Sequence, residues 1–81
     1  ADYLRLITYY LKSNNFTRIV EIYEKIVKRN PDPQHFASLA TAYANLGRLD
    51  EAEKATRRAV EIDPSFAPDA EVFLKSIGRK L

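Results

Sequence analysis

Apolar residues recur every three or four positions along most of the chain, and short polar segments separate the groups. This spacing is typical of α-helices that bury one face. No stretch alternates apolar and polar residues for long, so strands are not indicated. The recurring apolar positions fall into four groups: Tyr3, Leu6, Ile7 and Tyr10; Phe16, Ile19, Val20, Tyr23, Ile26 and Val27; Phe36, Leu39, Ala40 and Tyr43; Ala70, Phe73, Leu74 and Ile77.

The segments between these groups contain residues that end or begin helices. Asn14 and Gly47 suit the left-handed conformation that follows many helices, and Pro64 disfavours helical backbone at the preceding residue. Asp50, with Glu53 three residues later, predicts a capping box at the start of a helix. The pattern therefore predicts an all-α chain with helices at residues 2–13, 16–30, 33–46, 50–62 and 67–79.

The sequence repeats itself with a period of about 34 residues, which is typical of helical repeat proteins. One unit consists of two predicted antiparallel helices joined by a short turn, and the last predicted helix begins a third unit. Tyr3, Leu6, Tyr10, Asn14, Phe16 and Pro31 recur one period later as Phe36, Leu39, Tyr43, Gly47, Leu49 and Pro64; Phe36, Leu39, Ala40 and Tyr43 recur in turn as Ala70, Phe73, Leu74 and Ile77.

With these positions the chain resembles the tetratricopeptide repeat, whose pattern is W-x2-L-G-x2-Y, then A-x3-F, then P, over about 34 residues. The second unit supplies Phe36, Leu39, Ala40, Tyr43, Ala52, Thr56 and Pro64; the first supplies Tyr3, Leu6, Ile7, Tyr10, Ile19, Tyr23 and Pro31. The resemblance implies an α-α superhelix of five antiparallel helices. It divides a single domain, residues 1–81, into repeats at 1–32 and 33–66 and a capping helix at 67–81. We expect this domain to be a fragment of a longer protein.

The predicted helix at residues 50–62 has a thin apolar stripe made mostly of alanines. Ala52 and Ala59 would let this helix approach its partner closely, and neighbouring units complete the core of such a solenoid. The last helix carries Glu71, Lys75 and Arg79, which we expect on an outer face in contact with solvent.

Composition narrows the possible functions. Thirteen basic and eleven acidic residues give a net charge of +2, which is too small to indicate a nucleic-acid or membrane surface. The longest strongly apolar run, residues 6–11, has six residues, whereas a membrane-spanning helix needs roughly 20. The sequence therefore predicts neither nucleic-acid binding nor membrane insertion of this segment.

No catalytic constellation is apparent. His35 is the single histidine and there is no cysteine, which excludes a zinc site and a Cys–His nucleophile on ligand count. We expect His35 to be an exposed surface residue. Pairs of carboxylates lie in first helical turns, where they complement the helix dipole, and no glycine-rich loop is present to hold phosphates. We predict a chain that is not an enzyme and that uses no cofactor or metal.

The resemblance places a peptide-binding groove on the first helix of each unit. Residues expected to point into it are Leu4, Thr8, Leu11, Lys12, Gln34, Ala37, Thr41, Ala44, Asn45, Glu71 and Lys75. Some family members grip an acidic C-terminal carboxylate with lysine, asparagine and arginine side chains. The corresponding positions here hold Leu4, Thr8, Ser38, Pro68 and Val72, so that clamp is absent and the expected groove is mostly apolar.

Two interpretations of function remain open. The first is a non-catalytic interaction module that binds a peptide or partner segment in the groove. The alternative is a structural or oligomerisation appendage of a larger enzyme or membrane protein, with no peptide ligand. Leu4, Tyr9 and Leu11 on the first helix lack an obvious partner within the unit. An upstream segment could cover them, or a second copy could do so in a homodimer.

Overall fold

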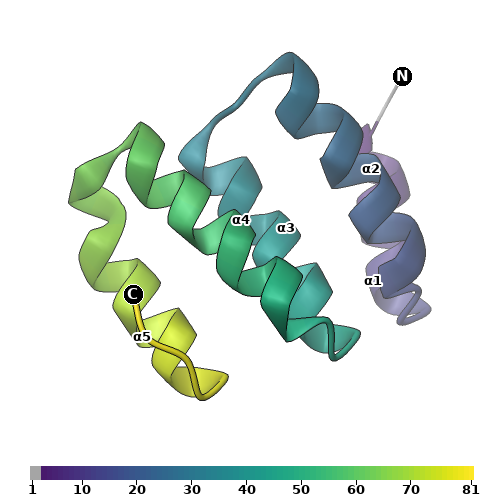
Figure 1. Cartoon of the computed structure of the whole chain (residues 1–81). Coiled ribbons are helices and arrows are strands. Elements are labelled where there is room, and N and C mark those ends of the chain that lie inside the picture. The colour runs from purple at the N-terminus through teal and green to yellow at the C-terminus, as the bar shows by residue number, and fades with distance from the viewer. Residues whose placement is uncertain (1–2) are drawn as a thin grey trace.

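The computed structural model describes residues 3–81, and within that range the regular elements are five α-helices and one short 3₁₀ turn (Figure 1). Successive helices run antiparallel, and each packs on the next, so the chain forms a row from α1 at one end to α5 at the other. The predicted all-α fold is confirmed. The elements are α1 (Tyr3–Lys12), α2 (Phe16–Arg29), α3 (Pro33–Asn45), α4 (Leu49–Ile62), η1 (Pro64–Phe66) and α5 (Ala67–Ser76).

The turns use the backbone conformations that the sequence predicts. Asn14 and Gly47 have φ angles of 56° and 75°, in the left-handed region that asparagine and glycine tolerate best. Asp32 precedes α3, and its carboxylate accepts a hydrogen bond of 2.7 Å from the Gln34 amide. Asp63 is extended before Pro64, so α4 ends there.

The capping box predicted at the start of α4 is wrong. The helix begins at Leu49, and Arg48 is its N-cap without a side-chain capping bond. The reason is the tight turn after α3: the Arg48 amide donates to the Tyr43 carbonyl at 3.0 Å, while the Arg48 carbonyl accepts from the Ala52 amide at 3.1 Å. Helical bonding therefore starts before Asp50.

The most extensive packing in the molecule is between α3 and α4. Ala40 and Ala52 are completely buried at this interface, beside Leu39 and Tyr43. Small side chains bring the two backbones close together, so the thin alanine stripe of α4 is sufficient. Thr56 stands where the family pattern has an aromatic residue; it is buried, and its hydroxyl donates to the Ala52 carbonyl at 2.8 Å.

The C-terminal end does not follow the prediction. The sequence places Arg79 on the outer face of a helix at residues 67–79, but α5 ends at Ser76. Gly78 has φ 76°, and the chain turns back in the way that glycine after a helix permits. The Arg79 guanidinium then contacts α4, with Nη1 2.7 Å from Asp50 Oδ1 and 3.2 Å from Glu53 Oε1.

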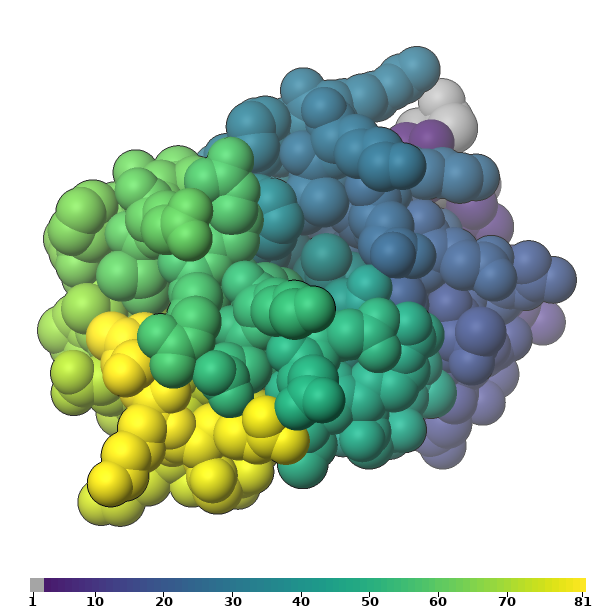
Figure 2. Space-filling model, in the orientation of Figure 1, coloured from purple at the N-terminus to yellow at the C-terminus, as the bar shows by residue number. Residues whose placement is uncertain are grey.

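A second bond attaches the same tail to α4. Arg57 donates to the Lys80 carbonyl at 2.9 Å and to the Glu53 carboxylate at 3.0 Å. Figure 2 shows the last residues lying against α4. The hydrogen bonds from Arg57 and then Arg79 lower the pKa of the Glu53 carboxyl. Ion pairs and a hydrogen bond therefore hold the C-terminal tail against α4.

A polar contact links α2 to α3. The Tyr43 hydroxyl donates to Glu24 Oε2 at 3.0 Å, and the Arg48 guanidinium lies 4.8 Å from the centre of the Tyr43 ring. Burial, followed by the hydrogen bond to Glu24, raises the pKa of Tyr43 to about 12. The neutral phenol is therefore favoured in the folded state.

Replacing Tyr43 with phenylalanine should destabilise the chain by about 1 kcal/mol at neutral pH, because one hydrogen bond is lost. An unfolded tyrosine ionises near a pKa of about 10. The stability that the phenol contributes is thus complete below that pH and is lost as pH rises through about 12. Urea unfolding at pH 8 and pH 11 checks this: the difference between wild type and Tyr43→Phe should shrink at the higher pH. A constant difference would contradict the role given to the phenol.

Candidate peptide-binding groove

The eleven residues predicted to line a groove lie on α1, α3 and α5. Nine of them are exposed, and Ala37 and Ala44 are half-buried. They do not all belong to one depression, however. They are Leu4, Thr8, Leu11 and Lys12 on α1; Gln34, Ala37, Thr41, Ala44 and Asn45 on α3; and Glu71 and Lys75 on α5.

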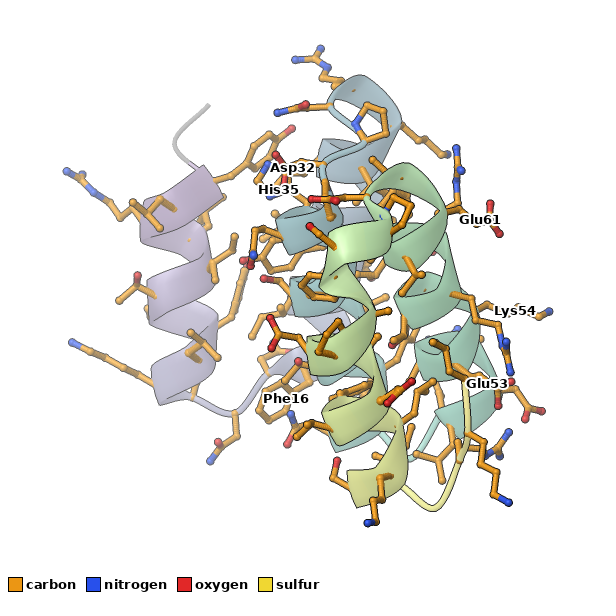
Figure 3. The ribbon with its side chains drawn as sticks, turned by 90° about the vertical axis from the view of Figure 1, so that its left-hand side faces the viewer. Phe16, Asp32, His35, Glu53, Lys54 and Glu61 are labelled. Atoms are coloured by element: carbon orange, nitrogen blue, oxygen red, sulfur yellow. The ribbon has the colours of Figure 1, made fainter. Side chains whose placement is uncertain are left out.

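A cleft of about 200 Å³ lies between α1, α2 and α3. Figure 3 shows Phe16, at the start of α2, with its side chain in the space between α1 and the other helices. Leu11 and Thr41 are the two predicted groove residues that line this cleft. Its full lining is Ile7, Leu11, Phe16, Ile19, Tyr23, Ser38, Thr41 and Ala42.

Three of the other lining residues, Phe16, Ile19 and Tyr23, were missed because they lie on α2, whereas the resemblance pointed to the first helix of each unit only. Ser38 and Ala42 lie one helical turn apart on α3, and both are small. Their size leaves a hollow between α1 and α3 that the larger α2 side chains Ile19 and Tyr23 also line. The sequence does contain a signal for the cleft: Ser38 and Ala42 are two small residues four positions apart, and the preceding helix, α2, is rich in large apolar side chains.

The remaining predicted residues line other surfaces. Glu71 and Lys75 line a depression of about 490 Å³ with residues 78–81 of the tail. Leu4, Thr8 and Lys12 line one of about 480 Å³ whose walls come from α1 alone. A depression on a single helix has no opposing wall, whereas the smaller cleft has walls from three helices. The cleft is therefore the better candidate site of these depressions.

Two predicted groove threonines already use their hydroxyl hydrogens within their own helices. Thr41 donates to the Ala37 carbonyl at 3.0 Å, and Thr8 donates to the Leu4 carbonyl at 3.0 Å. The Asn45 amide likewise donates to the Thr41 carbonyl at 2.9 Å. Thr41, which lines the cleft, therefore offers a methyl group and an oxygen acceptor to an incoming ligand. This side chain suits apolar groups and hydrogen-bond donors better than it suits a carboxylate.

His35 is half-buried, which corrects the prediction of an exposed surface histidine. Its ring packs against the Tyr23 ring, with 6.5 Å between centroids, because α3 lies on α2. Figure 3 shows His35 and Asp32 at the start of α3, far from the end where Phe16 lies. Residues 3–81 contain no cluster of three or more His, Asp or Glu side chains that could hold a metal ion.

Comparison with known proteins assigns a family. Residues 35–66, which include most of α3, all of α4 and η1, match the family model described as the tetratricopeptide repeat. Residues 35–66 form a tetratricopeptide repeat. The resemblance seen in the sequence is thereby confirmed. Repeats of this family generally mediate protein–protein interaction. Among the described residues of this chain, no helix is long and apolar enough to cross a membrane.

Two curated relatives come from Arabidopsis thaliana. The chain is 34% identical over 58 residues to Hsp70-Hsp90 organizing protein 3, and 33% identical over 58 residues to Hsp70-Hsp90 organizing protein 2. Each alignment covers 70% of this chain, and the chain spans about 10% of the length of either relative. No solved structure gives a significant match.

Proposed function

We propose that this tetratricopeptide-repeat chain is a non-catalytic interaction module that binds an apolar peptide segment in the cleft between α1, α2 and α3. The cleft itself is the observation that supports this function. Its volume of about 200 Å³ lies below the range of about 300–1,000 Å³ typical of small-molecule pockets. One large apolar side chain of a peptide fits a site of this size, and such anchors dominate the energy of many interfaces.

The proposed ligand is not an acidic C-terminal tail. The relatives are named for Hsp70 and Hsp90, and some family members hold acidic carboxylates with basic side chains. The matching positions here are neutral: Leu4 and Thr8 on α1, Ser38 on α3, and Pro68 and Val72 on α5. Leu4 and Val72 are 75% and 73% exposed, so a bound carboxylate would lie against apolar side chains.

Two labelled peptides of equal length test this proposal. One carries a central Leu-Phe pair with neutral flanks, and the other ends in glutamates and an aspartate. We expect fluorescence anisotropy to show binding of the apolar peptide, with little dependence on salt. Leu11→Lys, which places a charge in the cleft, should weaken this binding by at least about tenfold. Leu81→Lys makes the same change at an exposed site outside the cleft and should leave binding within about twofold.

Tighter and salt-sensitive binding of the acidic peptide would overturn the proposed specificity. Equal binding of the apolar peptide by both lysine variants would place its site elsewhere.

A second candidate function is a structural appendage that self-associates without a peptide ligand. The observation in its favour is the exposure of Leu4, Tyr9 and Leu11 on α1, at 75%, 65% and 51%. Such a chain would dimerise through residues 1–12, and residues 1–2 of that segment lie outside the described range. Sedimentation equilibrium of the chain alone, at high micromolar concentration, distinguishes the two candidates. The appendage would be a dimer under these conditions, and the interaction module would be a monomer.

A further inference from the structure

The cleft between α1, α2 and α3 is apolar except for three residues that carry a hydroxyl group. Ser38 and Thr41 lie three residues apart on one face of α3, and Tyr23 lies on α2. The other lining residues are apolar, and none of the lining residues is charged. A small number of polar groups in a largely apolar site usually decides which ligand binds there.

The three hydroxyls differ in the hydrogen bonds they can still form. Thr41 donates its hydrogen to the Ala37 carbonyl at 3.0 Å, so only its oxygen is available to a ligand. Across residues 3–81, the hydroxyls of Ser38 and Tyr23 form no hydrogen bond with another residue. No buried side-chain oxygen or nitrogen in that range lacks a partner, so these two hydroxyls are open to solvent. A ligand that fills the cleft takes them out of water.

This loss of solvent has a cost that depends on the ligand. A hydroxyl that is covered by hydrocarbon gives up its hydrogen bonds with water and gains none in return. A ligand with its own N–H or O–H group replaces one of those bonds. The cleft should therefore favour a side chain with a polar tip over a purely hydrocarbon side chain of the same shape.

The chemistry of the lining residues narrows the choice of side chain further. Lysine, arginine and carboxylate side chains are disfavoured, because no lining residue could pair with a charge taken out of water. An aromatic ring is favoured, because the rings of Phe16 and Tyr23 line the cleft and aromatic pairs attract one another. The Tyr23 ring is itself supported by the His35 ring, with 6.5 Å between centroids. Tyrosine and tryptophan combine a ring with a hydrogen-bond donor.

We infer that the cleft selects a partner segment anchored by tyrosine or tryptophan. The ring lies against the apolar walls, and its O–H or N–H group donates to the hydroxyl oxygen of Ser38 or Tyr23. This inference rests on the proposed function, because it specifies the ligand of the same cleft. A phenylalanine anchor fits the same walls but leaves both hydroxyls without a partner.

The test compares two labelled peptides that differ by one oxygen atom. One is the neutral peptide with a central Leu-Phe pair, and the other has Leu-Tyr at the same place. We expect fluorescence anisotropy on the whole chain to show about two- to tenfold tighter binding of the tyrosine peptide, the effect of one net hydrogen bond.

A double variant removes the hydroxyls that the inference uses. In Ser38→Ala/Tyr23→Phe the ratio of the two affinities should fall to about one, while the phenylalanine peptide binds at least as tightly as it binds wild type. The matched control is Tyr9→Phe/Ser76→Ala, which removes the same two groups from residues outside the cleft. It should keep the wild-type ratio. Circular dichroism checks that both variants retain the helical content of wild type.

The possible failures are distinguishable. Equal binding of the two peptides by wild type would overturn this inference, and so would a preference for tyrosine that persists in Ser38→Ala/Tyr23→Phe. In both cases the phenylalanine peptide still binds, so the proposed function stands. If neither peptide bound to wild type, the proposed function would be wrong, and this inference would be wrong with it.

Discussion

Replacing Leu74 with alanine is expected to lower the free energy of unfolding by about 2–5 kcal/mol, the usual range for removing a buried leucine side chain. Leu74 is completely buried in α5, and so is Ala70 one turn before it. The loss has two sources: the transfer of apolar surface to water, and the cavity that remains if the neighbouring side chains do not collapse into it. A domain of 81 residues has only a few kcal/mol of stability to lose.

The same helix provides the control. Val72 lies two residues away and is 73% exposed, so Val72→Ala should change stability by less than about 0.5 kcal/mol. Thermal unfolding followed by circular dichroism separates the two variants, because 1 kcal/mol shifts the midpoint of a domain of this size by about 4–8 °C. If Leu74→Ala and Val72→Ala had the same melting temperature, α5 would not be part of the core.

Replacing Ala52 with leucine is expected to destabilise the chain by about 1–3 kcal/mol through overpacking. Ala52 is completely buried, and its helix α4 packs on α3 in the most extensive helix contact of the molecule. Its carbonyl also accepts the Thr56 hydroxyl at 2.8 Å. Three extra carbon atoms have no space between these helices, so either the backbones separate or the leucine adopts a strained rotamer.

Lys54→Leu is the matched control, because it introduces the same side chain at an exposed position of α4. Its stability should stay within about 0.5 kcal/mol of wild type, and equilibrium unfolding in urea measures both variants. A wild-type midpoint for Ala52→Leu would mean that Ala52 does not lie at the closest approach of the two helices.

Local chemistry in the sequence determined where α1 ends and where α2, α3 and α4 begin and end, to within about one residue; the predicted start of the first helix, at residue 2, lies outside the described range. Asn14 and Gly47 occupy left-handed positions that few other residues tolerate, and Asp32 caps α3 through its own side chain. Each of these effects depends on residues within one turn of the chain. The sequence repeat added the pairing of the helices, because equivalent apolar stripes bury equivalent surfaces.

The same local reasoning could not predict contacts between residues that are far apart in the sequence. Arg79 reaches Asp50, which lies a whole helix pair earlier in the sequence, and no local pattern predicts that the tail turns back to α4. This contact depends on where α4 lies relative to the tail, so the apolar periodicity along one helix cannot predict it.

The sequence by itself determined an all-α chain of paired helices with an alanine-lined contact. Helical spacing, helix-breaking residues and the repeat can all be read from the order of residues along the chain. Only the tertiary structure decided which side chains share a surface. It separated Leu11, in the cleft, from Glu71 and Lys75 near the tail, and it left Leu6 exposed while its repeat equivalent, Leu39, is buried. The physical reason is that exposure depends on the neighbours across each interface: α3 packs extensively on both α2 and α4, whereas α1 packs less extensively, on α2.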